Sequence, residues 1–324
     1  MFSKHVLAID AESVAEEAAH FIRVEVLETL RRRGAVVGIS GGIDSAVVAA
    51  LCARALGNER VLGLLMPERD SSCDALRLGL MLAGHLDIDA IVEDIAPALV
   101  GVGCYVRQNE AIRAAFPDYG DGWKCKVSLP SILEGDRLNV CRLTVRSPSG
   151  EERTSRLPPA AYLSLVAATN YKQRVRKMTE YHHADRLRYA VAGTPNRLEY
   201  DQGFFVKQGD GAADFKPIAH LYKTQVYALA EHLGIPDEIR SRPPTTDTYS
   251  MAQTQEEFYF ALPYDQMDLC LYGHNQRIPA MEVAESIGLT EAQVKRVYVD
   301  IEAKRRATRY LHAPPLLVRA VEEV

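Results

Sequence analysis

Hydrophobic positions at the start of the chain follow a helical period. Apolar residues recur at steps of three and four between residues 11 and 33, which predicts an amphipathic helix. The next apolar run, residues 35–39, is short and continuous, as in a buried strand. Residues 40–45 are small and polar and predict a loop. The alanine-rich residues 46–56 then predict a second helix, which ends at Gly57.

The same alternation of short apolar runs and helical spacing continues along the chain. Residues 60–66 and 90–95 predict two further strands, with a helix between them over 73–85. Residues 189–192 predict a fourth strand. Strands that alternate with helices at this spacing indicate parallel βαβ units. The sequence therefore predicts an α/β fold built on a doubly wound parallel sheet.

Residues 119–158 interrupt this alternation. They contain three short β-prone runs, at 124–129, 139–145 and 152–157. The turn-forming sequence Ser-Pro-Ser-Gly at 147–150 separates the last two runs, which predicts a β-hairpin. We interpret residues 119–158 as an insertion within a single domain spanning residues 1–324.

Beyond residue 218 the pattern is mostly helical. The clearest helical stretches are 226–233, 255–260 and 290–310. We expect a helical C-terminal part that packs beside the sheet.

Composition excludes several classes of protein. The chain has 324 residues, of which 47% are hydrophobic and 25% charged, and these proportions are those of a globular protein. It contains no run of about 18 uninterrupted apolar residues, so we expect no membrane-spanning helix and no membrane partner. The N-terminal residues lack the apolar core of a signal peptide. The six cysteines form no CxxC pair, which favours reduced thiols in the cytoplasm over a disulfide framework or a zinc ribbon. The net charge of −5 disfavours a general nucleic-acid binder.

The loop after the first predicted strand has the composition of an anion site. Its residues are Gly38, Ile39, Ser40, Gly41, Gly42, Ile43, Asp44 and Ser45. A helix that begins here directs unpaired N–H groups and partial positive charge at the loop, and adjacent glycines let the backbone approach a phosphate. Asp44 suits such a site only if a cation such as Mg²⁺ separates it from the phosphates. The alternative is a tight turn in which Asp44 caps the helix. Neither the Walker pattern nor GxGxxG is present.

The complete string Ser-Gly-Gly-Ile-Asp-Ser resembles the pyrophosphate loop of the N-type ATP pyrophosphatases, which cleave ATP to AMP and pyrophosphate. Other stretches resemble one family within that group, the NAD synthetases, which amidate nicotinic acid adenine dinucleotide (deamido-NAD). These stretches are 193–199, the long loop 203–214, Lys223, 244–247 and the helix 170–178. The resemblance covers most of residues 5–100 and 165–310 and lapses over the insertion. It implies an adenine nucleotide alpha hydrolase-like sheet.

The resemblance also implies roles for individual residues. ATP would bind the loop Gly38–Ser45 together with Thr194, Lys223 and Thr245. Mg²⁺ would bind Asp44 and Glu199, and the acyl substrate would contact Arg174, Lys207 and Asp214. Each residue also has an ordinary alternative. Glu199 could be an exposed helix carboxylate, the lysines and Arg174 solvated surface charges, and the threonines turn or cap residues.

The reaction implied by the resemblance proceeds through an acyl-adenylate. The substrate carboxylate attacks the α-phosphorus of ATP and expels pyrophosphate; ammonia then attacks the acyl carbon and AMP leaves. No protein nucleophile is required. The loop motif begins by residue 38, which leaves no room upstream for a glutaminase domain, so free ammonia or a separate glutaminase is the expected nitrogen source. Members of the family form homodimers, and a homodimer is expected.

The sequence departs from the family pattern near its C-terminus. Residues 310–315 read Tyr-Leu-His-Ala-Pro-Pro where the family has a His-Lys pair. Together with the insertion, this departure keeps two other hypotheses open. One is a homologous amide ligase that adenylates a different carboxylate. The other is a non-catalytic nucleotide-binding regulator with the same fold.

Overall fold

The computed structural model describes residues 2–129, 141–245 and 248–321. A parallel sheet lies at its centre with strand order β3-β2-β1-β7. The four strands are β1 (Ala35–Gly38), β2 (Val61–Leu65), β3 (Asp89–Val92) and β7 (Ala190–Ala192). Each predicted strand is present within three residues of its expected ends, and the parallel α/β prediction is confirmed.

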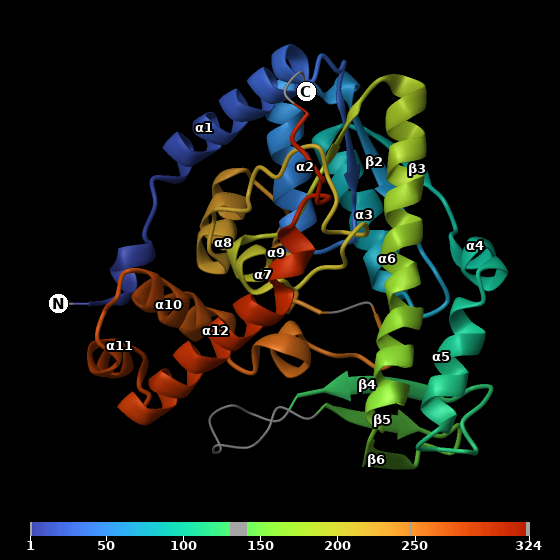
Figure 1. Ribbon diagram of the computed structural model, residues 1–324. Helices are drawn as coiled ribbons and strands as arrows, with labels where there is room; N and C mark the ends of the chain where they lie inside the picture. The colour runs from blue at the N-terminus through green and yellow to red at the C-terminus, as the bar shows by residue number, and fades with distance from the viewer. Residues whose placement is uncertain (1, 130–140, 246–247, 322–324) are drawn as a thin grey trace.

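Helices bury both faces of this sheet (Figure 1). Alternate residues of a strand point to opposite faces, so Val37 packs with one group of helices and Val36 with the other. The first group comprises α1 (Ala11–Arg23), α2 (Ile43–Leu56), α3 (Cys73–Leu86) and α8 (Lys223–His232). The second comprises α4 (Ala96–Gly101), α5 (Cys104–Arg113) and the long α6 (Pro159–Leu187). Burial on both faces explains why β1, β2 and β7 read as continuous apolar runs, whereas the edge strand β3 is largely exposed.

The first helix is shorter than the sequence pattern predicts. It begins after Asp10, whose side chain accepts the Ser13 N–H, and continues as π-helical turns to Thr29. The prediction to residue 33 is wrong because Arg31 has a φ of 51°, outside the helical region. The backbone therefore leaves the helix before the arginine run, and β1 follows directly.

The second helix begins earlier than predicted, at Ile43. Gly42 is its N-cap, and the Ser45 hydroxyl donates to the Gly42 carbonyl at 2.9 Å. Ile43, Asp44 and Ser45, the last three residues of the segment that we call the loop Gly38–Ser45, therefore form the first helical turn. Their place on the helix matters for the site, because it directs the N–H groups of that turn toward whatever binds there.

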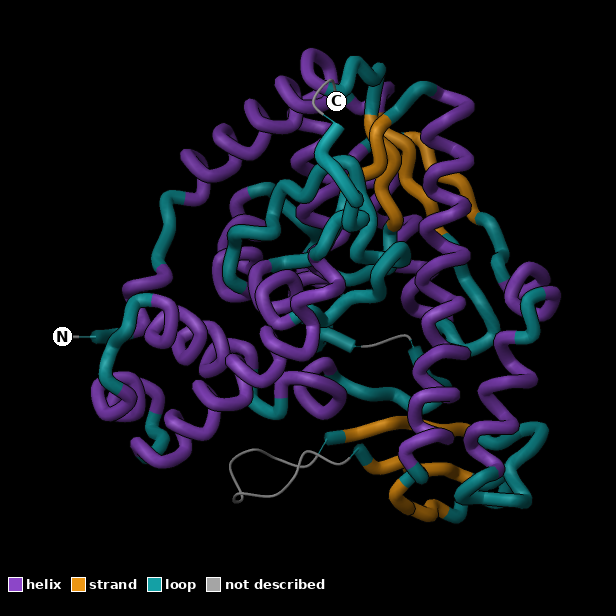
Figure 2. The backbone as a smooth tube through the Cα atoms, viewed as in Figure 1, coloured by secondary structure: helices purple, strands orange, loops and turns teal. Residues whose placement is uncertain are grey.

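The inserted region forms a second, antiparallel sheet of order β4-β5-β6 (Figure 2). Its strands are β4 (Lys124–Ser128), β5 (Arg142–Arg146) and β6 (Glu152–Arg156). The predicted hairpin is confirmed, with Arg146 opposite Glu152 across the turn at 147–150. Residues 139 and 140 of the predicted run 139–145 lie outside the described residues. Buried residues of this sheet, α5 and α6 form a separate hydrophobic cluster.

The C-terminal part is helical, as predicted, and all of it except α8 and the short helix that follows α8 packs around a core of its own. Its helices are α7 (Arg197–Gln202), α8, α9 (Asp237–Arg240), a π-helical turn at Glu256–Phe260, α10 (Tyr264–Asn275), α11 (Ala280–Ile287) and α12 (Glu291–His312). The described residues also form short 3-10 turns at Lys4–Leu7 and Asn58–Arg60. Within the described residues, no helix is long and apolar enough to cross a membrane.

Candidate active site

A cavity of about 780 Å³ opens at the carboxyl ends of the central strands. Ile39 follows β1, Met66 follows β2 and Thr194 follows β7, and all three line it. Other walls come from α6, α7, α12 and residues 242–259. β1 has β2 as its neighbour on one side and β7 on the other, so the strand order reverses at β1. Open α/β sheets bind ligands in the crevice at such a reversal.

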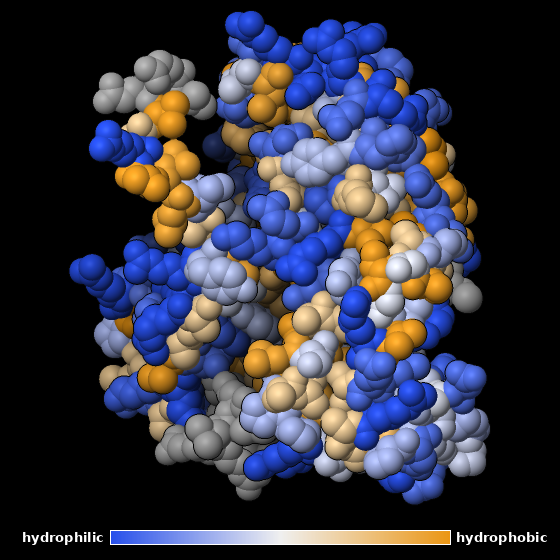
Figure 3. All heavy atoms as spheres, turned by 45° about the vertical axis from the view of Figure 1, so that its right-hand side comes forward, coloured by the Kyte–Doolittle hydropathy of each residue, from blue (hydrophilic) through white to orange (hydrophobic). Residues whose placement is uncertain are grey.

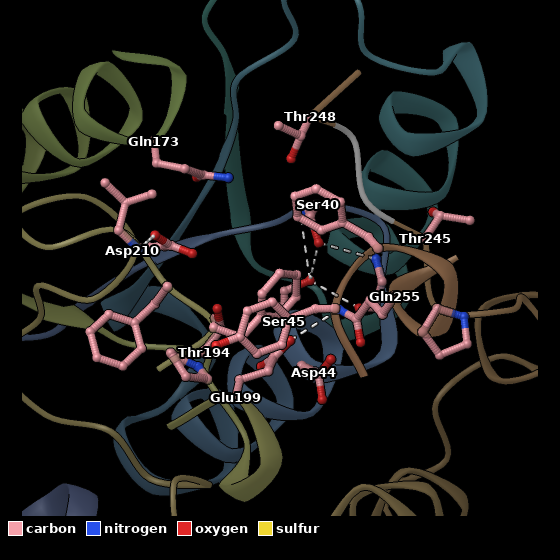
Figure 4. A pocket seen from close by; sticks show the side chains of 18 of the residues that line it. Ser40, Asp44, Ser45, Gln173, Thr194, Glu199, Asp210, Thr245, Thr248 and Gln255 are labelled. Atoms are coloured by element: carbon pink, nitrogen blue, oxygen red, sulfur yellow. Dashed lines mark hydrogen bonds between the residues drawn. The ribbon is translucent and has the colours of Figure 1, made fainter. Parts of the chain in front are cut away.

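The glycine- and serine-rich loop forms one wall of this cavity (Figure 4). Its two serine hydroxyls lie 3.2 Å apart, and the Gly42 N–H donates to the Ser40 hydroxyl at 3.3 Å. The N–H groups of Ile43, Asp44 and Ser45 have no acceptor within α2, because they belong to its first turn. This wall therefore presents N–H donors at the positive end of a helix, which suits an anion.

Gly41 gives the loop its shape. Its φ of +74° lies in the left-handed region, and a Cβ placed on it would lie 2.6 Å from the Ala75 carbonyl oxygen. Both constraints favour glycine over any other residue at this position. Gly41 does not itself line the cavity, so its contribution is to the path of the backbone.

Asp44 accepts hydrogen bonds from two residues that lie far away in the sequence. The Lys223 ammonium donates to one carboxylate oxygen at 2.5 Å, and the Asn196 side-chain amide donates to the other at 3.1 Å. Lys223 is 2% exposed, whereas Asp44 keeps 16% of its side chain exposed toward the cavity. The buried lysine thus compensates the charge of a carboxylate that still faces the ligand space.

Glu199 lies beside Asp44 at the start of α7 (Figure 4). One carboxylate oxygen accepts the Asn196 N–H in a capping box, and the other accepts the Gln255 side-chain amide at 3.0 Å. Desolvation, reinforced by repulsion from Asp44, raises the pKa of Glu199 to about 8. Beside a single lysine, this second carboxyl group is therefore held mostly protonated near neutral pH, and a further cation would be needed to stabilise its charged form.

Asp268 holds Lys223 in place. It is fully buried on α10, and its carboxylate accepts the backbone N–H groups of Lys223 and Thr224 at the start of α8. Burial disfavours the charged form of Lys223, but Asp44 and Glu199 outweigh it and raise the pKa of the ammonium group. Lys223 is therefore a fixed cation.

The carboxylates fit a hard divalent cation. The described residues contain no group of three or more His, Cys, Asp and Glu side chains able to hold a metal ion. Mg²⁺ commonly binds one or two carboxylates and takes its remaining ligands from water and substrate phosphates. Asp44 and Glu199, two neighbouring carboxyl groups that share one lysine, match that donor set.

A family model for NAD synthase matches residues 14–115 and 149–309. The chain belongs to the NAD synthase family. The NH(3)-dependent NAD(+) synthetase of Mesorhizobium japonicum is 67% identical over 312 residues, which cover 96% of this chain and 98% of the relative. That of Rhizobium meliloti is 58% identical over 324 residues, which cover 100% and 97% of the two chains.

Solved structures confirm the NAD synthase fold. An NMN synthetase from Francisella tularensis aligns with a TM-score of 0.65 at 22% identity, covering 96% of this chain and 99% of that one. An NH3-dependent NAD synthetase from Campylobacter jejuni aligns with a TM-score of 0.60 at 21% identity, covering 96% and 100%. The two segments matched by the NAD synthase family model leave out residues 116–148, which contain most of the inserted sheet.

The three residues predicted to contact the acyl substrate do not line the cavity. Arg174 is exposed on α6, and its Nε donates to the Lys207 carbonyl at 3.3 Å. The Lys207 ammonium donates to the Tyr310 and Ala313 carbonyls. Asp214 accepts the Val191 N–H and the Tyr181 hydroxyl. Their roles in binding stay predictions.

The cavity is also lined by charged residues that the sequence analysis did not predict. Lys177 and Glu180, one helical turn apart on α6, form a buried ion pair at 2.6 Å, and burial raises the pKa of Glu180. Asp210 accepts the Val206 N–H, and burial raises its pKa too. The i, i+3 spacing of Lys177 and Glu180 was visible in the sequence, but nothing there placed the pair beside the loop.

Asn196 and Gln255 are two further residues that sequence reasoning missed. Asn196 stands three residues before Glu199, the spacing of a capping box, so its cap role could have been predicted. Its contact with Asp44 spans 152 positions, and that of Gln255 with Glu199 spans 56. Only the fold brings these partners together.

Proposed function

We propose that the protein converts deamido-NAD to NAD, using ATP and ammonia and releasing AMP and pyrophosphate. The observation that carries this proposal is the arrangement of Asp44, Glu199 and Lys223 beside the loop Gly38–Ser45. The high identity to NH(3)-dependent NAD(+) synthetases over nearly the whole chain supports the same conclusion.

ATP lies in the cavity with its phosphates against the loop Gly38–Ser45. The N–H groups of the first turn of α2 and the Lys223 ammonium offset the charge of the departing pyrophosphate. Thr194 and Thr245, on opposite sides of the loop in Figure 4, supply hydroxyl groups to the nucleotide. Asp44 and Glu199 would hold Mg²⁺, which would neutralise phosphate charge when bound.

The chemistry needs positioning more than it needs a reactive side chain. Oxide is a very poor leaving group, so the substrate carboxylate first attacks the α-phosphorus and pyrophosphate leaves. Ammonia then attacks the acyl carbon, the C–O bond to the adenylate breaks, and AMP leaves. The cavity walls hold the reactants in place, and the fixed charges stabilise the negative charge on the reacting phosphate groups.

Arg174, Lys207 and Asp214 orient the acyl substrate. Arg174 contacts the backbone of Lys207, so these two residues already form one cluster outside the cavity. Substrate that reaches from this cluster toward the loop would bring its carboxylate to the α-phosphorus. The nitrogen source is ammonia, taken up directly or delivered by a separate glutaminase.

We also propose a homodimer that acts in the cytoplasm. Val106 on α5 and Leu163 and Met178 on α6 are large apolar side chains, each more than 60% exposed. Figure 3 turns this side of the molecule forward and shows apolar residues gathered over it. Such a surface is typical of an interface. Cys52, Cys104, Cys125, Cys141 and Cys270 are free, as expected where thiols stay reduced.

Quantifying the products of one reaction tests this function. Purified protein is incubated with Mg-ATP, ammonium and deamido-NAD, and mass spectrometry measures NAD, AMP and pyrophosphate. We expect equal amounts of all three. Pyrophosphate release that depends on another carboxylic acid, without NAD, would indicate the different amide ligase. ATP binding without pyrophosphate release over a panel of acids would indicate a regulator.

A further inference from the structure

The inserted sheet contacts the active site through the outer edge of β4. Residues 124, 126 and 128 alternate with 125 and 127 along this strand, and the odd-numbered residues direct their backbone groups away from β5. Cys125 donates its N–H to the Ser250 hydroxyl at 2.9 Å and accepts the Met251 N–H at 3.0 Å. The segment 248–259 thus occupies the edge that β5 leaves free.

Further contacts extend along the same edge. The Val127 carbonyl accepts the side-chain amide of Gln253, which is buried. The Leu129 N–H donates to the Glu257 carbonyl at 3.0 Å, and the Lys126 ammonium lies 3.4 Å from the Glu257 carboxylate. Cys125, Val127 and Leu129, the residue after β4, therefore all form backbone hydrogen bonds with the segment 248–259.

The other side of the segment faces the cavity. Tyr249, Gln255, Phe258 and Tyr259 all line it. Gln255 lies between the contacts of Gln253 and Glu257 with the inserted sheet, and its amide donates to Glu199. The segment therefore joins the inserted sheet to the carboxylate that we assign to Mg²⁺.

We propose that the inserted sheet is a positioning element of the active site, which holds Gln255 against Glu199 through the β4 edge. Glu199 needs such a partner, because its carboxylate must keep one orientation to share a cation with Asp44. Groups that orient a metal ligand through a hydrogen bond typically change metal affinity by about tenfold or more when they are lost. The inference rests on the proposed function for the role of Mg²⁺.

Removing the Ser250 hydroxyl group, which contacts the β4 edge, tests the proposal. Ser250→Ala deletes the acceptor of the Cys125 N–H, and Ser250→Thr keeps a hydroxyl there. Thr154→Val is the matched control, because it deletes a hydroxyl that bonds Thr144 between β5 and β6, away from the segment. Titration calorimetry measures the Kd for ATP with and without Mg²⁺. This readout needs no acyl substrate.

We expect Ser250→Ala to raise the Kd in Mg²⁺ by roughly tenfold and to leave the Mg²⁺-free Kd unchanged. Ser250→Thr and Thr154→Val should resemble the wild type. Gln255→Ala should reproduce the effect of Ser250→Ala, and the double variant should be no worse than Gln255→Ala alone. Equal effects of Ser250→Ala and Thr154→Val, or additive effects with Gln255→Ala, would overturn the proposal. Wild-type protein that binds Mg-ATP but makes no NAD would instead contradict the proposed function.

Discussion

At the residue scale, the site holds two carboxylates and one fixed cation. The charged forms of Asp44 and Glu199 repel each other, and the buried Lys223 ammonium attracts both. The arrangement is stable because Asp268 and Asn196 orient the groups through hydrogen bonds. One lysine does not suffice to keep both carboxyl groups ionised, and a divalent cation would stabilise the charged form of Glu199, which is the electrostatic reason for expecting one.

Replacing Lys223 by methionine should expose this imbalance. Removing one partner of a buried ion pair costs about 3–5 kcal/mol of unfolding free energy, because the other charge stays buried. Lys223→Met should therefore lose several kcal/mol in urea denaturation, and Mg²⁺ should restore part of it. Lys295→Met is the control, since the Lys295–Glu291 pair is exposed and is worth less than about 1 kcal/mol. Equal losses in the two variants would contradict the assignment.

Asp268 should give stability a dependence on pH. Burial raises the pKa of this carboxyl to about 6, above its ordinary value of 3.8. Between those values the folded state binds a proton that the unfolded state does not, so the contribution of Asp268 to stability falls as pH rises. The unfolding free energy of the wild type, relative to Asp268→Asn, should drop by roughly 1 kcal/mol from pH 5 to 7. Urea denaturation at both pH values measures this; a constant or growing difference would refute it.

The residues of the site were only partly predictable from sequence. The loop was predicted from its own residues and Glu199 and Lys223 from a family resemblance, and the structure places all of them at the cavity. Gln255 has no such signal, since its role depends on a partner 56 positions away. Arg174 was predicted from a resemblance on its helix, and the structure places its side chain outside the cavity.

At the element scale, the strands and the hairpin were predictable and the ends of helices were less so. Buried strands such as β1 carry a continuous apolar run, and the turn at 147–150 is written in its residue types. The start of α2 depends on the Gly42 cap, which the alanine-rich pattern does not reveal. α4 and α5 were missed because their exposed faces carry valines, which weaken the helical contrast between polar and apolar positions.

The turn before α2 should depend on Gly41. Gly41→Ala forces a side chain into a left-handed conformation and against the Ala75 carbonyl, so we expect a loss of about 1–3 kcal/mol in unfolding free energy. ATP affinity should fall as well, because the N–H groups of α2 move. Gly84→Ala on α3 has open space around it and should be neutral or stabilising. Similar effects of both changes would show that the loop tolerates a different path.

At the scale of the whole molecule, the chain combines a central parallel sheet with a second sheet at one end (Figure 2). Long α6 links the two, since it packs on the central sheet through Val175 and beside the inserted sheet through Leu165. The interpretation of residues 1–324 as one domain with an insertion at 119–158 stays a prediction. Sequence alone could not show how the insertion meets the cavity, because its contacts are made with residues more than 100 positions away.

We expect the exposed apolar side of α5 and α6 to form the interface of a homodimer. We expect the wild type to sediment as a dimer, and Leu163→Glu to shift the equilibrium toward monomer, because a charge on an apolar interface is costly. Leu80→Glu on α3 is the control, as Leu80 is also exposed but lies on the opposite side of the central sheet. Identical sedimentation of the two variants would place the interface elsewhere.

The central claim is that the substrate carboxylate attacks the α-phosphorus of ATP at the loop Gly38–Ser45. Labelling that carboxylate with ¹⁸O tests it most directly, because the attacking oxygen stays on phosphorus when ammonia displaces AMP. Mass spectrometry of the products should find one ¹⁸O atom in AMP and none in pyrophosphate. Label in pyrophosphate, or unlabelled AMP formed together with NAD, would contradict the account.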